Sequence, residues 1–381
     1  MKISIVCAFN PNRNTGMYTV DKAALDFFKN LPDAKLSFYT IGDLSQFDSG
    51  ESEETINYMS LLDNYESFIS SDRIVYWGDF LHSYTYWIND LIPRMLAHKV
   101  SSSFDESIEH IYKTILLEGA ETSVLNKVVI YGSTMLPDDS TVLTEDRYFS
   151  GIKRLLSHSR GVFFRDALSN AKYSFLDSDR SMYGTDCAIL NSNTYPISTK
   201  INNKVAVYFG RSGRLERLKF LTFAYFVTKK SGKKPKWVQW FPQKNRDRIF
   251  SYLLSGKVSQ EQQQPSDIIQ NLYSYDFVIT DVYHMAVNSW ARGIPAILIG
   301  YGAKHDKGTL GSKKKETLYA QFFLQKFYVY WEDLSLFNFH KTIKDVCSTL
   351  ENKSTIKKLN DIIRAVALKS SLRLKQCFLE D

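Results

Sequence analysis

Hydrophobic positions in the first half of the chain alternate between short continuous apolar runs and longer segments with helical spacing. The apolar runs predict five strands, with the sequences KISIVCAF, KLSFYTI, RIVYWGD, KVVIYGS and GVFFRD. Segments with helical spacing separate them, most clearly at residues 19–31, 83–99 and 105–119. Continuous apolar runs are typical of strands that are buried on both faces of a parallel sheet. The pattern therefore predicts an α/β domain over residues 1–195.

A polar, turn-rich stretch at residues 191–204, NSNTYPISTKINNK, interrupts this alternation and predicts a linker. The apolar runs KVAVYFGR, KWVQWF, DFVIT, PAILIG and KFYVYWED then predict a second α/β domain over residues 196–345. Residues 346–381 continue with helical spacing. We therefore expect two doubly wound, Rossmann-like domains in a GT-B-like arrangement with C-terminal helices. Ligands of doubly wound sheets bind beyond the carboxyl ends of the strands, so we expect a ligand cleft between the domains.

Composition and charge limit the cellular location and the classes of binding partner that we expect. The net charge of +7 over 381 residues suits a small anionic substrate or contact with an anionic membrane surface. No nucleic-acid partner is expected, because no long Lys/Arg block interleaves with aromatic residues. The apolar runs are too short for a membrane span or a signal peptide, and the four scattered cysteines form no CxxC pair. We expect a cytoplasmic protein without metal or other cofactor, with peripheral contact at the inner face of the membrane allowed.

Polar residues follow several strands of the first domain. In NPNRNTGMYTVD, Asn14 and Gly16 lead into a helix, where free N–H groups suit an anion or an acceptor sugar hydroxyl; plain helix capping explains them equally. In YWGDFLHSY, Asp79 suits a base for an acceptor hydroxyl with His82 beside it, or a helix cap. In VFFRDALS, Arg165 can direct a bidentate fork at an anion or make a surface contact with its neighbour.

Three further candidates follow strands of the second domain. Arg211 ends the first of its strands, His284 lies where another gives way to a helix, and Lys304 follows the next. An anion beside Arg211 would meet a guanidinium and the N–H groups of a helix start together. A lone histidine is more often a packed core residue. A histidine with two cations on neighbouring strand ends is a better candidate for binding a ligand.

The segment DFVITDVYHMAVNSWARGIPAILIGYGAK, residues 276–304, resembles the signature segment of the polysaccharide pyruvyltransferase family. Both contain a strand, a His at a helix start, a Gly-x-Pro turn, a second strand and a Lys in that order. The segments VFFRDALSNAKYSFL, GTDCAIL and NTGMYTVDKAALDFF resemble other stretches of that family. The match runs in pieces over about residues 10–305, and only the His284 segment is specific.

The resemblance implies a GT-B-like enzyme that transfers the enolpyruvyl unit of phosphoenolpyruvate to a sugar of a cell-surface polysaccharide or its lipid-linked precursor. By position, Arg211 would match the family's phosphate-binding arginine and His284 its histidine, as an acid or a phosphate ligand. Arg165 and Lys304 would be further cations at the donor. The chain departs from the family two residues before this histidine, where many members have Arg, and directly after it, where many have Gly. These positions hold Val282 and Met285.

Two other functions remain open. A GT-B glycosyltransferase that uses a nucleotide sugar would fit the same fold. Many such enzymes carry a Glu before the Gly-x-Pro turn, where this chain has Asn288 and no Glu from residue 280 to residue 300. A non-catalytic glycan-binding protein could keep the fold and bind sugar without turning over either donor.

Overall fold

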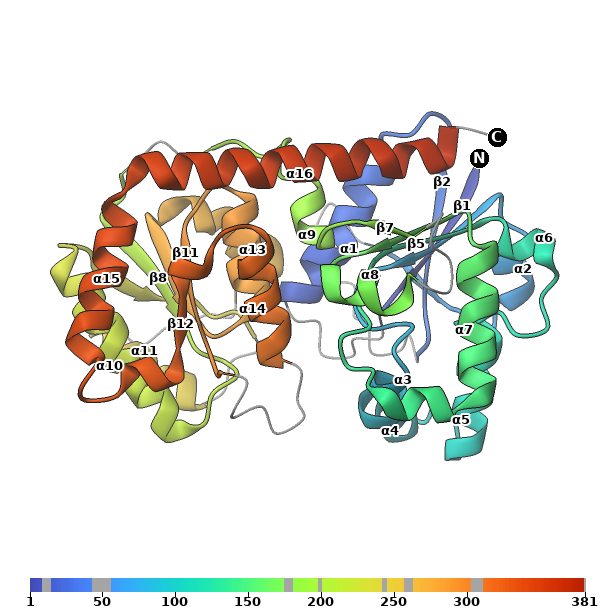
Figure 1. The fold of residues 1–381 in the computed structure, drawn as a ribbon, viewed down its shortest axis with the longest axis horizontal. Helices are drawn as coiled ribbons and strands as arrows, with labels where there is room; N and C mark the ends of the chain where they lie inside the picture. Colours follow the sequence, from blue (N-terminus) through green and yellow to red (C-terminus); the bar gives the residue numbers. More distant parts are fainter. Residues whose placement is uncertain are drawn as a thin grey trace. The chain divides into compact units, whose positions relative to one another are not determined.

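The computed structural model describes residues 1–8, 15–42, 56–174, 181–197, 201–241, 245–256, 263–302 and 311–379. Figure 1 labels most of its helices and strands. Contacts divide the chain into two compact units. Unit 1 comprises Met1–Arg13, Val20–Leu190 and Lys369–Asp381, and unit 2 comprises Asn14–Thr19 and Asn191–Leu368. The structure is of the α/β class predicted from the sequence.

Unit 1 is built on a seven-stranded parallel sheet with the order β3-β2-β1-β4-β5-β6-β7. The central strands are buried almost throughout, as their continuous apolar runs predict. Chain connections leave in opposite directions from β1 and β4, so the switch point of the sheet lies between them. The strands are β1 (Lys2–Cys7), β2 (Lys35–Thr40), β3 (Tyr58–Ser60), β4 (Arg73–Trp77), β5 (Val128–Ser133), β6 (Gly161–Phe164) and β7 (Ser181–Tyr183).

Helices cover this sheet and close its connections. The α-helices are α1 (Thr15–Phe28), α2 (Tyr65–Ile69), α3 (Tyr84–Tyr86), α4 (Ile92–Ala97), α5 (Phe104–Thr114), α6 (Thr122–Leu125), α7 (Asp146–His158), α8 (Ala167–Tyr173) and α9 (Cys187–Leu190). A π-helical turn, η2 (Trp87–Leu91), joins α3 to α4, and η3 (Ser140–Thr144) is a 3₁₀ turn.

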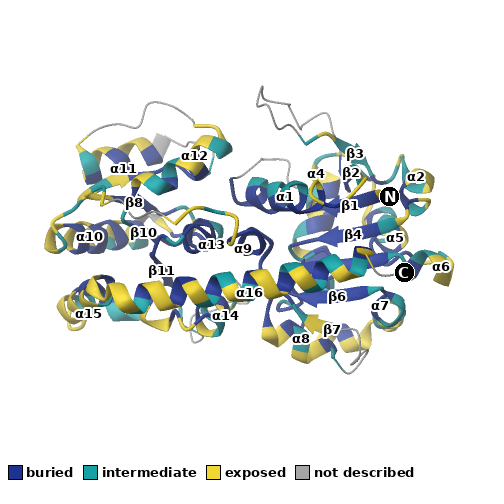
Figure 2. Ribbon diagram, turned by 90° about the horizontal axis from the view of Figure 1, so that it is seen from above, coloured by how far each residue is buried: buried dark blue, intermediate teal, exposed yellow. Residues whose placement is uncertain are grey.

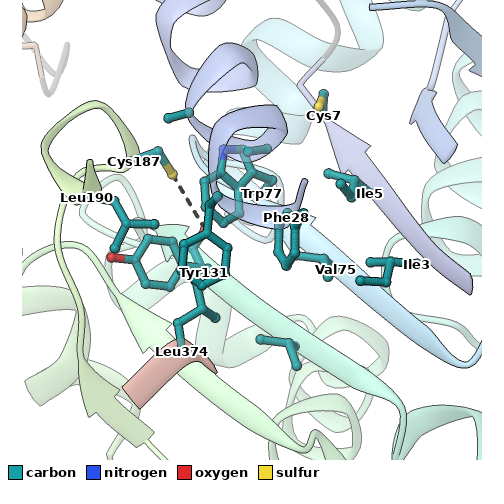
Figure 3. Packing of buried hydrophobic residues seen from close by; sticks show 14 of the residues in the cluster. Ile3, Ile5, Cys7, Phe28, Val75, Trp77, Tyr131, Cys187, Leu190 and Leu374 are labelled. Carbon is teal, nitrogen blue, oxygen red and sulfur yellow. Dashed lines mark hydrogen bonds between the residues drawn. The ribbon is translucent and has the colours of Figure 1, made fainter. Parts of the chain in front are cut away.

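The core of unit 1 contains residues from both ends of the described chain, such as Ile3 and Leu374, as Figure 3 shows. Trp77 of β4 stacks on Tyr131 of β5 with ring centroids 5.0 Å apart. Phe28 of α1 meets the ring of Phe378, near the C-terminus, at 5.1 Å. Leu374 is also fully buried in this cluster. The last turns of the chain are therefore part of the same core as its first strand.

Unit 2 is built on a five-stranded parallel sheet with the order β12-β11-β10-β8-β9. Its switch point lies between β8 and β10, because the connection from β8 leads to one edge and that from β10 to the other. The strands are β8 (Lys204–Tyr208), β9 (Lys234–Trp237), β10 (Phe277–Thr280), β11 (Ala296–Gly300) and β12 (Tyr328–Tyr330).

The remaining helices include the longest of the described chain, α16, which begins in unit 2 and enters unit 1 at Lys369. The α-helices are α10 (Arg214–Lys230), α11 (Asn245–Ser255), α12 (Pro265–Asn271), α13 (Tyr283–Ala291), α14 (Gly311–Gln321), α15 (Phe339–Glu351) and α16 (Lys353–Leu379). Short 3₁₀ turns are η4 (Leu272–Ser274), η6 (Gln325–Phe327) and η7 (Trp331–Leu334). None of the described helices is both long and apolar enough to cross a bilayer.

The contacts group two short segments differently from the predicted division at residues 195 and 345. Residues 14–19 belong to unit 2, where the Thr15 hydroxyl donates to the carbonyl oxygen of Trp240 at 2.8 Å. Residues 369–381 belong to unit 1, because Leu374 and Phe378 pack in its core. Helical spacing at 346–381 indicates the helix but not the unit that each of its turns joins.

Candidate functional site

The switch point of the unit 2 sheet brings together residues that lie far apart in the sequence. The chain that leaves β8 carries Arg211, and the chain that leaves β10 carries Asp281 and His284. Strands β8 and β10 are direct neighbours, with Tyr208 opposite Thr280. Ligands of doubly wound sheets bind at the carboxyl edge beside such a point. Two of the three second-domain candidates, Arg211 and His284, thus follow neighbouring strands at this edge.

Asp281 holds the loop that carries Arg211. Its buried carboxylate accepts hydrogen bonds from the backbone N–H groups of Gly210, Arg211 and Ser212 at 2.8, 3.0 and 2.8 Å. Hydrogen bonds to an ionised acceptor are stronger than neutral ones, so the loop is firmly positioned. The sequence analysis missed Asp281, although an Asp directly after a buried strand is a visible signal.

The hydrogen bonds to Asp281 change the expectation that an anion beside Arg211 would meet free backbone N–H groups. The next amide, at Gly213, donates to the carboxylate of Glu216 at 2.7 Å. Four consecutive amides at this edge therefore have acceptors within the unit. An anion beside Arg211 would meet the guanidinium, but it would not meet the amides of residues 210–213 as free donors.

The guanidinium of Arg211 is exposed and lies 4.9 Å from the centroid of the Phe241 ring. Within the described ranges it makes no side-chain hydrogen bond or ion pair. The ring gives the cation a preferred position without neutralising its charge. Arg211 is therefore well suited to bind a phosphate or carboxylate group through its planar fork.

Two further carboxylates lie at the same edge. Glu216 accepts from Gly213, and Glu332, after β12, accepts from the N–H group of Gly302 at 3.1 Å. Burial and a hydrogen bond to Glu216 raise the pKa of Tyr301, and the charges of nearby carboxylates add to this shift. Carboxylates accept hydrogen bonds from hydroxyl groups. The edge thus combines an exposed cation with acceptors suited to hydroxyl-rich ligands.

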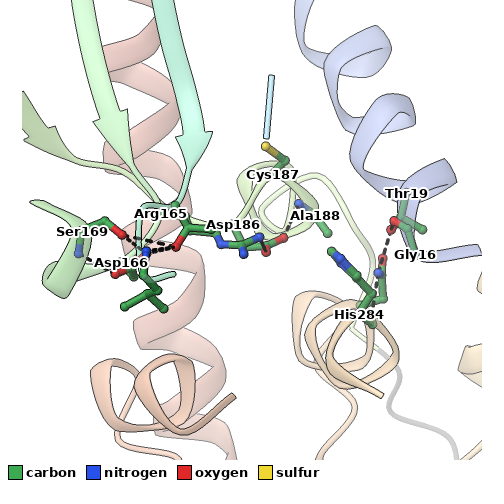
Figure 4. Close-up of polar contacts among 12 residues, drawn as sticks. Gly16, Thr19, Arg165, Asp166, Ser169, Asp186, Cys187, Ala188 and His284 are labelled. Atoms are coloured by element: carbon green, nitrogen blue, oxygen red, sulfur yellow. Dashed lines mark hydrogen bonds and ion pairs between the residues drawn. The ribbon is translucent and has the colours of Figure 1, made fainter. Parts of the chain in front are cut away.

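His284 is the second residue of α13 and lies against Gly16 of α1, as Figure 4 shows. A Cβ atom added at Gly16 would lie 2.8 Å from Cβ of His284 and 2.9 Å from its Cγ and Cδ2 atoms. The histidine is only partly buried, and its ring packs edge-on against Tyr283 at 5.1 Å. Gly16 is therefore required for close packing at His284, a contact that neither sequence motif predicts alone.

Asn288, one turn after His284, has a structural role. Its amide donates to Thr19 Oγ1 at 2.9 Å and to the carbonyl oxygen of His284 at 2.8 Å. Its own side-chain oxygen accepts from Arg292 at 3.1 Å. Asn288 thus ties α13 to the first turns of α1, so its amide is already engaged where a glutamate would be expected for ribose binding.

Asp79 follows β4 at the switch point of the unit 1 sheet. Gly78 and Asp79 both have left-handed backbone conformations, with φ angles of 73° and 52°. The carbonyl oxygen of Asp79 accepts from the N–H group of Thr134 at 3.0 Å, which holds this strained turn. The side chain is partly exposed and makes no hydrogen bond or ion pair in the part of the chain described. Ser83, not Asp79, caps the following helix.

Arg165, after β6, is buried rather than exposed. Its guanidinium lies 3.6 Å from Asp186 Oδ2 (Figure 4). It also lies 5.2 Å from the centroid of the Phe80 ring. The surface contact with Asp166 considered from the sequence is wrong. Asp166 instead caps α8 by accepting from the N–H group of Ser169 at 2.7 Å. A role for Arg165 in binding a donor stays a prediction, and its guanidinium lies beside the Asp186 carboxylate.

His82 is a core residue and does not reach an acceptor. Its ring is fully buried and packs edge-on against Tyr76 at 4.9 Å. Among the described residues, neither ring nitrogen has a hydrogen-bond partner. Burial lowers the pKa of His82 to about 3, so the imidazole is neutral. The sequence placed His82 correctly after a strand, but its position relative to Asp79 does not reveal that it points into the core.

A second buried group, Asp21 of α1, was not singled out by the sequence. Burial raises its pKa to about 7, hydrogen bonds from Tyr58 and Cys7 oppose that shift, and the charge of Asp79 adds to it. Tyr58 donates to Asp21 Oδ2 at 2.5 Å. Asp79 therefore lies close enough to a buried carboxyl group to influence its charge.

Two of the sequence candidates, Asn14 and Lys304, lie outside the described residues. In the described ranges, no group of three or more His, Cys, Asp or Glu side chains is placed to hold a metal ion.

Comparisons with known proteins extend the description of the fold. No protein-family model matches the chain, and no curated protein sequence matches it. An alpha-glucosyltransferase solved with UDP-glucose and DNA containing an abasic site has a TM-score of 0.51 and 13% identity, over 99% of this chain and 98% of that one. UDP-GlcNAc 2-epimerase from Neisseria meningitidis bound to UDP-GlcNAc has a TM-score of 0.55 and 10% identity, over the full length of both chains.

A third similar structure is that of a protein from Listeria monocytogenes, provisionally assigned as a UDP-N-acetylglucosamine 2-epimerase. Its TM-score is 0.55 at 10% identity, over 100% of this chain and 97% of that one. At these identities the likeness concerns the fold alone. The two parallel sheets and this likeness together show that the chain has a GT-B-like fold.

Proposed function

We propose that this protein is a glycosyltransferase that binds a nucleotide-sugar donor at the carboxyl edge of the unit 2 sheet. The observation that carries the proposal is the position of Arg211 and His284 after the neighbouring strands β8 and β10, at the switch point of the sheet. The chain also resembles, over 99% or more of its length, two structures solved with UDP-glucose and UDP-GlcNAc. These features support a donor that joins a diphosphate to a sugar.

The mixture of charges at this edge favours such a donor. Arg211 supplies an exposed cation for a diphosphate, while Glu216 and Glu332 supply acceptors for ribose or sugar hydroxyls. A small, dense anion such as phosphoenolpyruvate is better matched by several cations without carboxylates beside them. Departure of the diphosphate leaves negative charge on its terminal oxygen, which the Arg211 guanidinium would stabilise.

Asp79 is the proposed base for the acceptor hydroxyl. Its carboxylate is partly exposed and is held on a strained turn at the unit 1 switch point, as a residue with a functional constraint often is. In the transfer, the carboxylate takes the hydroxyl proton, the hydroxyl oxygen bonds to the sugar carbon, and the bond from that carbon to the diphosphate breaks.

Pyruvyl transfer from phosphoenolpyruvate is the second candidate. The observation in its favour is the segment from β10 through His284 and the Gly-x-Pro turn to β11, which has the order of elements found in the pyruvyltransferase signature. The absence of a Glu from residue 280 to residue 300 also fits this candidate. In this reaction Arg211 would hold the phosphate.

Binding calorimetry with UDP-, GDP-, ADP- and CMP-sugars, phosphoenolpyruvate and inorganic phosphate distinguishes these functions. We expect one nucleotide sugar to bind. Removing the guanidinium in Arg211→Ala should weaken binding about 10- to 100-fold, since a hydrogen bond to a charged group contributes about 1.5–3 kcal/mol. The donor affinity of Arg211→Lys should fall between those of the unchanged protein and Arg211→Ala, because lysine keeps the charge but lacks the planar fork.

Arg248→Ala removes another exposed arginine of unit 2 and is the matched control, with unchanged donor affinity expected. Binding of phosphoenolpyruvate alone, lost in Arg211→Ala, would establish the second candidate instead. Binding of neither class of donor would overturn both.

A further inference from the structure

Helices α10 and α11 of unit 2 expose large apolar side chains. In the first turns of α10 these are Leu215 and Leu218, and on α11 they are Ile249, Tyr252 and Leu253. Each is between 45% and 82% exposed. Figure 2 shows the exposed residues on both helices. Single exposed apolar residues are ordinary, but a set at helical spacing on two adjoining helices marks an interaction surface.

The opposite faces of these helices already form the core of unit 2. Phe220 and Phe223 of α10 and Phe250 of α11 are buried. The helices contact each other through Arg217, whose guanidinium lies 5.2 Å from the Phe250 ring centroid and 3.7 Å from Asp247 Oδ1. The exposed apolar residues are therefore additional to those that the fold requires. We call the set Leu215, Leu218, Ile249, Tyr252 and Leu253 the α10–α11 surface.

The charge of the surrounding segment is strongly positive. Residues 211–256 contain twelve Lys and Arg and two Asp and Glu, a net charge of +10, whereas the whole chain carries +7. The remainder of the chain is therefore net negative, at −3. Arg248 of α11 and Lys229 and Lys230 at the end of α10 are exposed. Asp247 is buried against Arg217, so the exposed charges of helices α10 and α11 are predominantly basic.

We propose that the α10–α11 surface docks on an anionic lipid membrane. Exposed leucine and isoleucine side chains can enter the boundary between headgroups and acyl chains, while basic residues contact the lipid phosphates. Tyr252 has the amphipathic ring that favours this interface. The proposal concerns attachment to one face of the bilayer and does not depend on which donor binds.

Two other occupants fit the surface less well. A second copy of the chain, related by a two-fold axis, would bring two predominantly basic segments against each other. A nucleic acid would match the charge, but its phosphates would leave the exposed aliphatic side chains without an apolar partner. The combination of charge and exposed leucine or isoleucine side chains favours anionic lipid.

Cosedimentation with phosphatidylcholine vesicles, with and without phosphatidylglycerol, tests the proposal. The protein should bind the vesicles that contain phosphatidylglycerol and be released by high salt. The double variant Ile249→Ser/Leu253→Ser should bind at least about tenfold more weakly, because two apolar side chains are lost. Arg248→Gln should bind about fivefold more weakly, from the loss of one basic contact.

The matched control is Leu143→Ser in unit 1, because Leu143 is 57% exposed and lies outside this surface. It should bind vesicles as the unchanged protein does, and all variants should keep the melting temperature. Equal binding of the Ile249→Ser/Leu253→Ser variant would overturn the proposal. So would binding to a DNA duplex without vesicle binding, or a dimer that this variant dissociates without any effect on vesicles.

Discussion

At the residue scale, two groups in unit 1 show burial shifting pKa values in opposite directions. Burial raises the pKa of the Asp21 carboxyl to about 7 and lowers that of the His82 imidazole to about 3. Both shifts have the same cause, since each disfavours the charged form. At neutral pH His82 therefore contributes no charge to the core, whereas Asp21 lies near the midpoint of its titration.

The His82 shift predicts acid sensitivity. An unfolded histidine binds a proton near pH 6.5, but His82 in the folded protein does so only near pH 3. The free energy of unfolding is therefore not reduced by His82 above about pH 6.5. As the pH falls from there toward 3, protonation of His82 in the unfolded chain lowers the free energy of unfolding by about 1.4 kcal/mol per pH unit. In His82→Phe, the free energy of unfolding should depend correspondingly less on pH across this range, as urea denaturation can measure.

His340→Gln replaces an exposed histidine of α15 and serves as the control. It should leave the pH dependence unchanged. If His82→Phe and the unchanged protein lose stability equally between pH 6.5 and pH 3, His82 does not carry the effect.

Sequence patterns placed most candidate side chains after the correct strands but did not give their directions. Asp79 and Arg211 are exposed to different degrees, while His82 and Arg165 point into the interior. The left-handed turn at Gly78 and Asp79 determines the direction of the Asp79 side chain. The buried carboxylate of Asp186 determines the direction of the Arg165 side chain. These are tertiary features, which spacing along the chain does not encode.

At the element scale, the loop between β8 and α10 illustrates how one side chain fixes a segment. Asp281 accepts from three consecutive amides, so the position of Arg211 depends on a residue 70 positions later in the chain. A loop held in this way keeps its shape before a ligand arrives, which lowers the conformational entropy lost on binding.

The substitution Asp281→Asn should therefore weaken both the fold and the site. The side-chain amide that it introduces would place a donor against the N–H groups of residues 210–212, with a loss of about 3 kcal/mol in the free energy of unfolding. Donor affinity should also fall, although Asp281 itself is buried. Urea denaturation and calorimetry measure the two effects.

Asp267→Asn changes an exposed aspartate of α12 and should alter stability by less than about 0.5 kcal/mol. An Asp281→Asn variant that binds the donor normally would show that the hydrogen bonds between Asp281 and residues 210–212 are not needed for donor binding.

Strongly periodic elements were predictable, and irregular ones were not. The buried strands of both sheets follow the continuous apolar runs. Residues 83–99 were predicted as one helix but contain a π-helical turn before Pro93, which lacks an N–H group to donate within a regular helix. Strands β3 and β7 have three residues each, too few to give a pattern.

At the scale of the whole molecule, units and sequence segments do not coincide. The chain passes from unit 1 to unit 2 at residue 14, returns at residue 20, passes again at residue 191 and returns at residue 369. The polar stretch at 191–204 marked one of these positions from the sequence. The others lie within α1 and α16 or next to α1, where helical spacing continues without a break.

Unit 1 should accordingly depend on the last residues of the chain. Phe378 is 5% exposed and packs on Phe28, so Phe378→Ala should lower the free energy of unfolding by about 3–5 kcal/mol. Leu372 lies on the same helix but is 56% exposed, and Leu372→Ala should change it by less than about 0.5 kcal/mol. Equal losses in urea denaturation would contradict a specific role for Phe378 in the core.

The packing of Leu374 and Phe378 also sets an order of events during synthesis on the ribosome. Unit 1 contains β1, yet its core lacks these side chains until residues 374–378 are translated. All of residues 191–368 emerge before that point, so unit 2 has its full sequence first. The nascent amino-terminal half therefore has an incomplete core, exposed to chaperones and to aggregation, until residues 369–378 have also been synthesised.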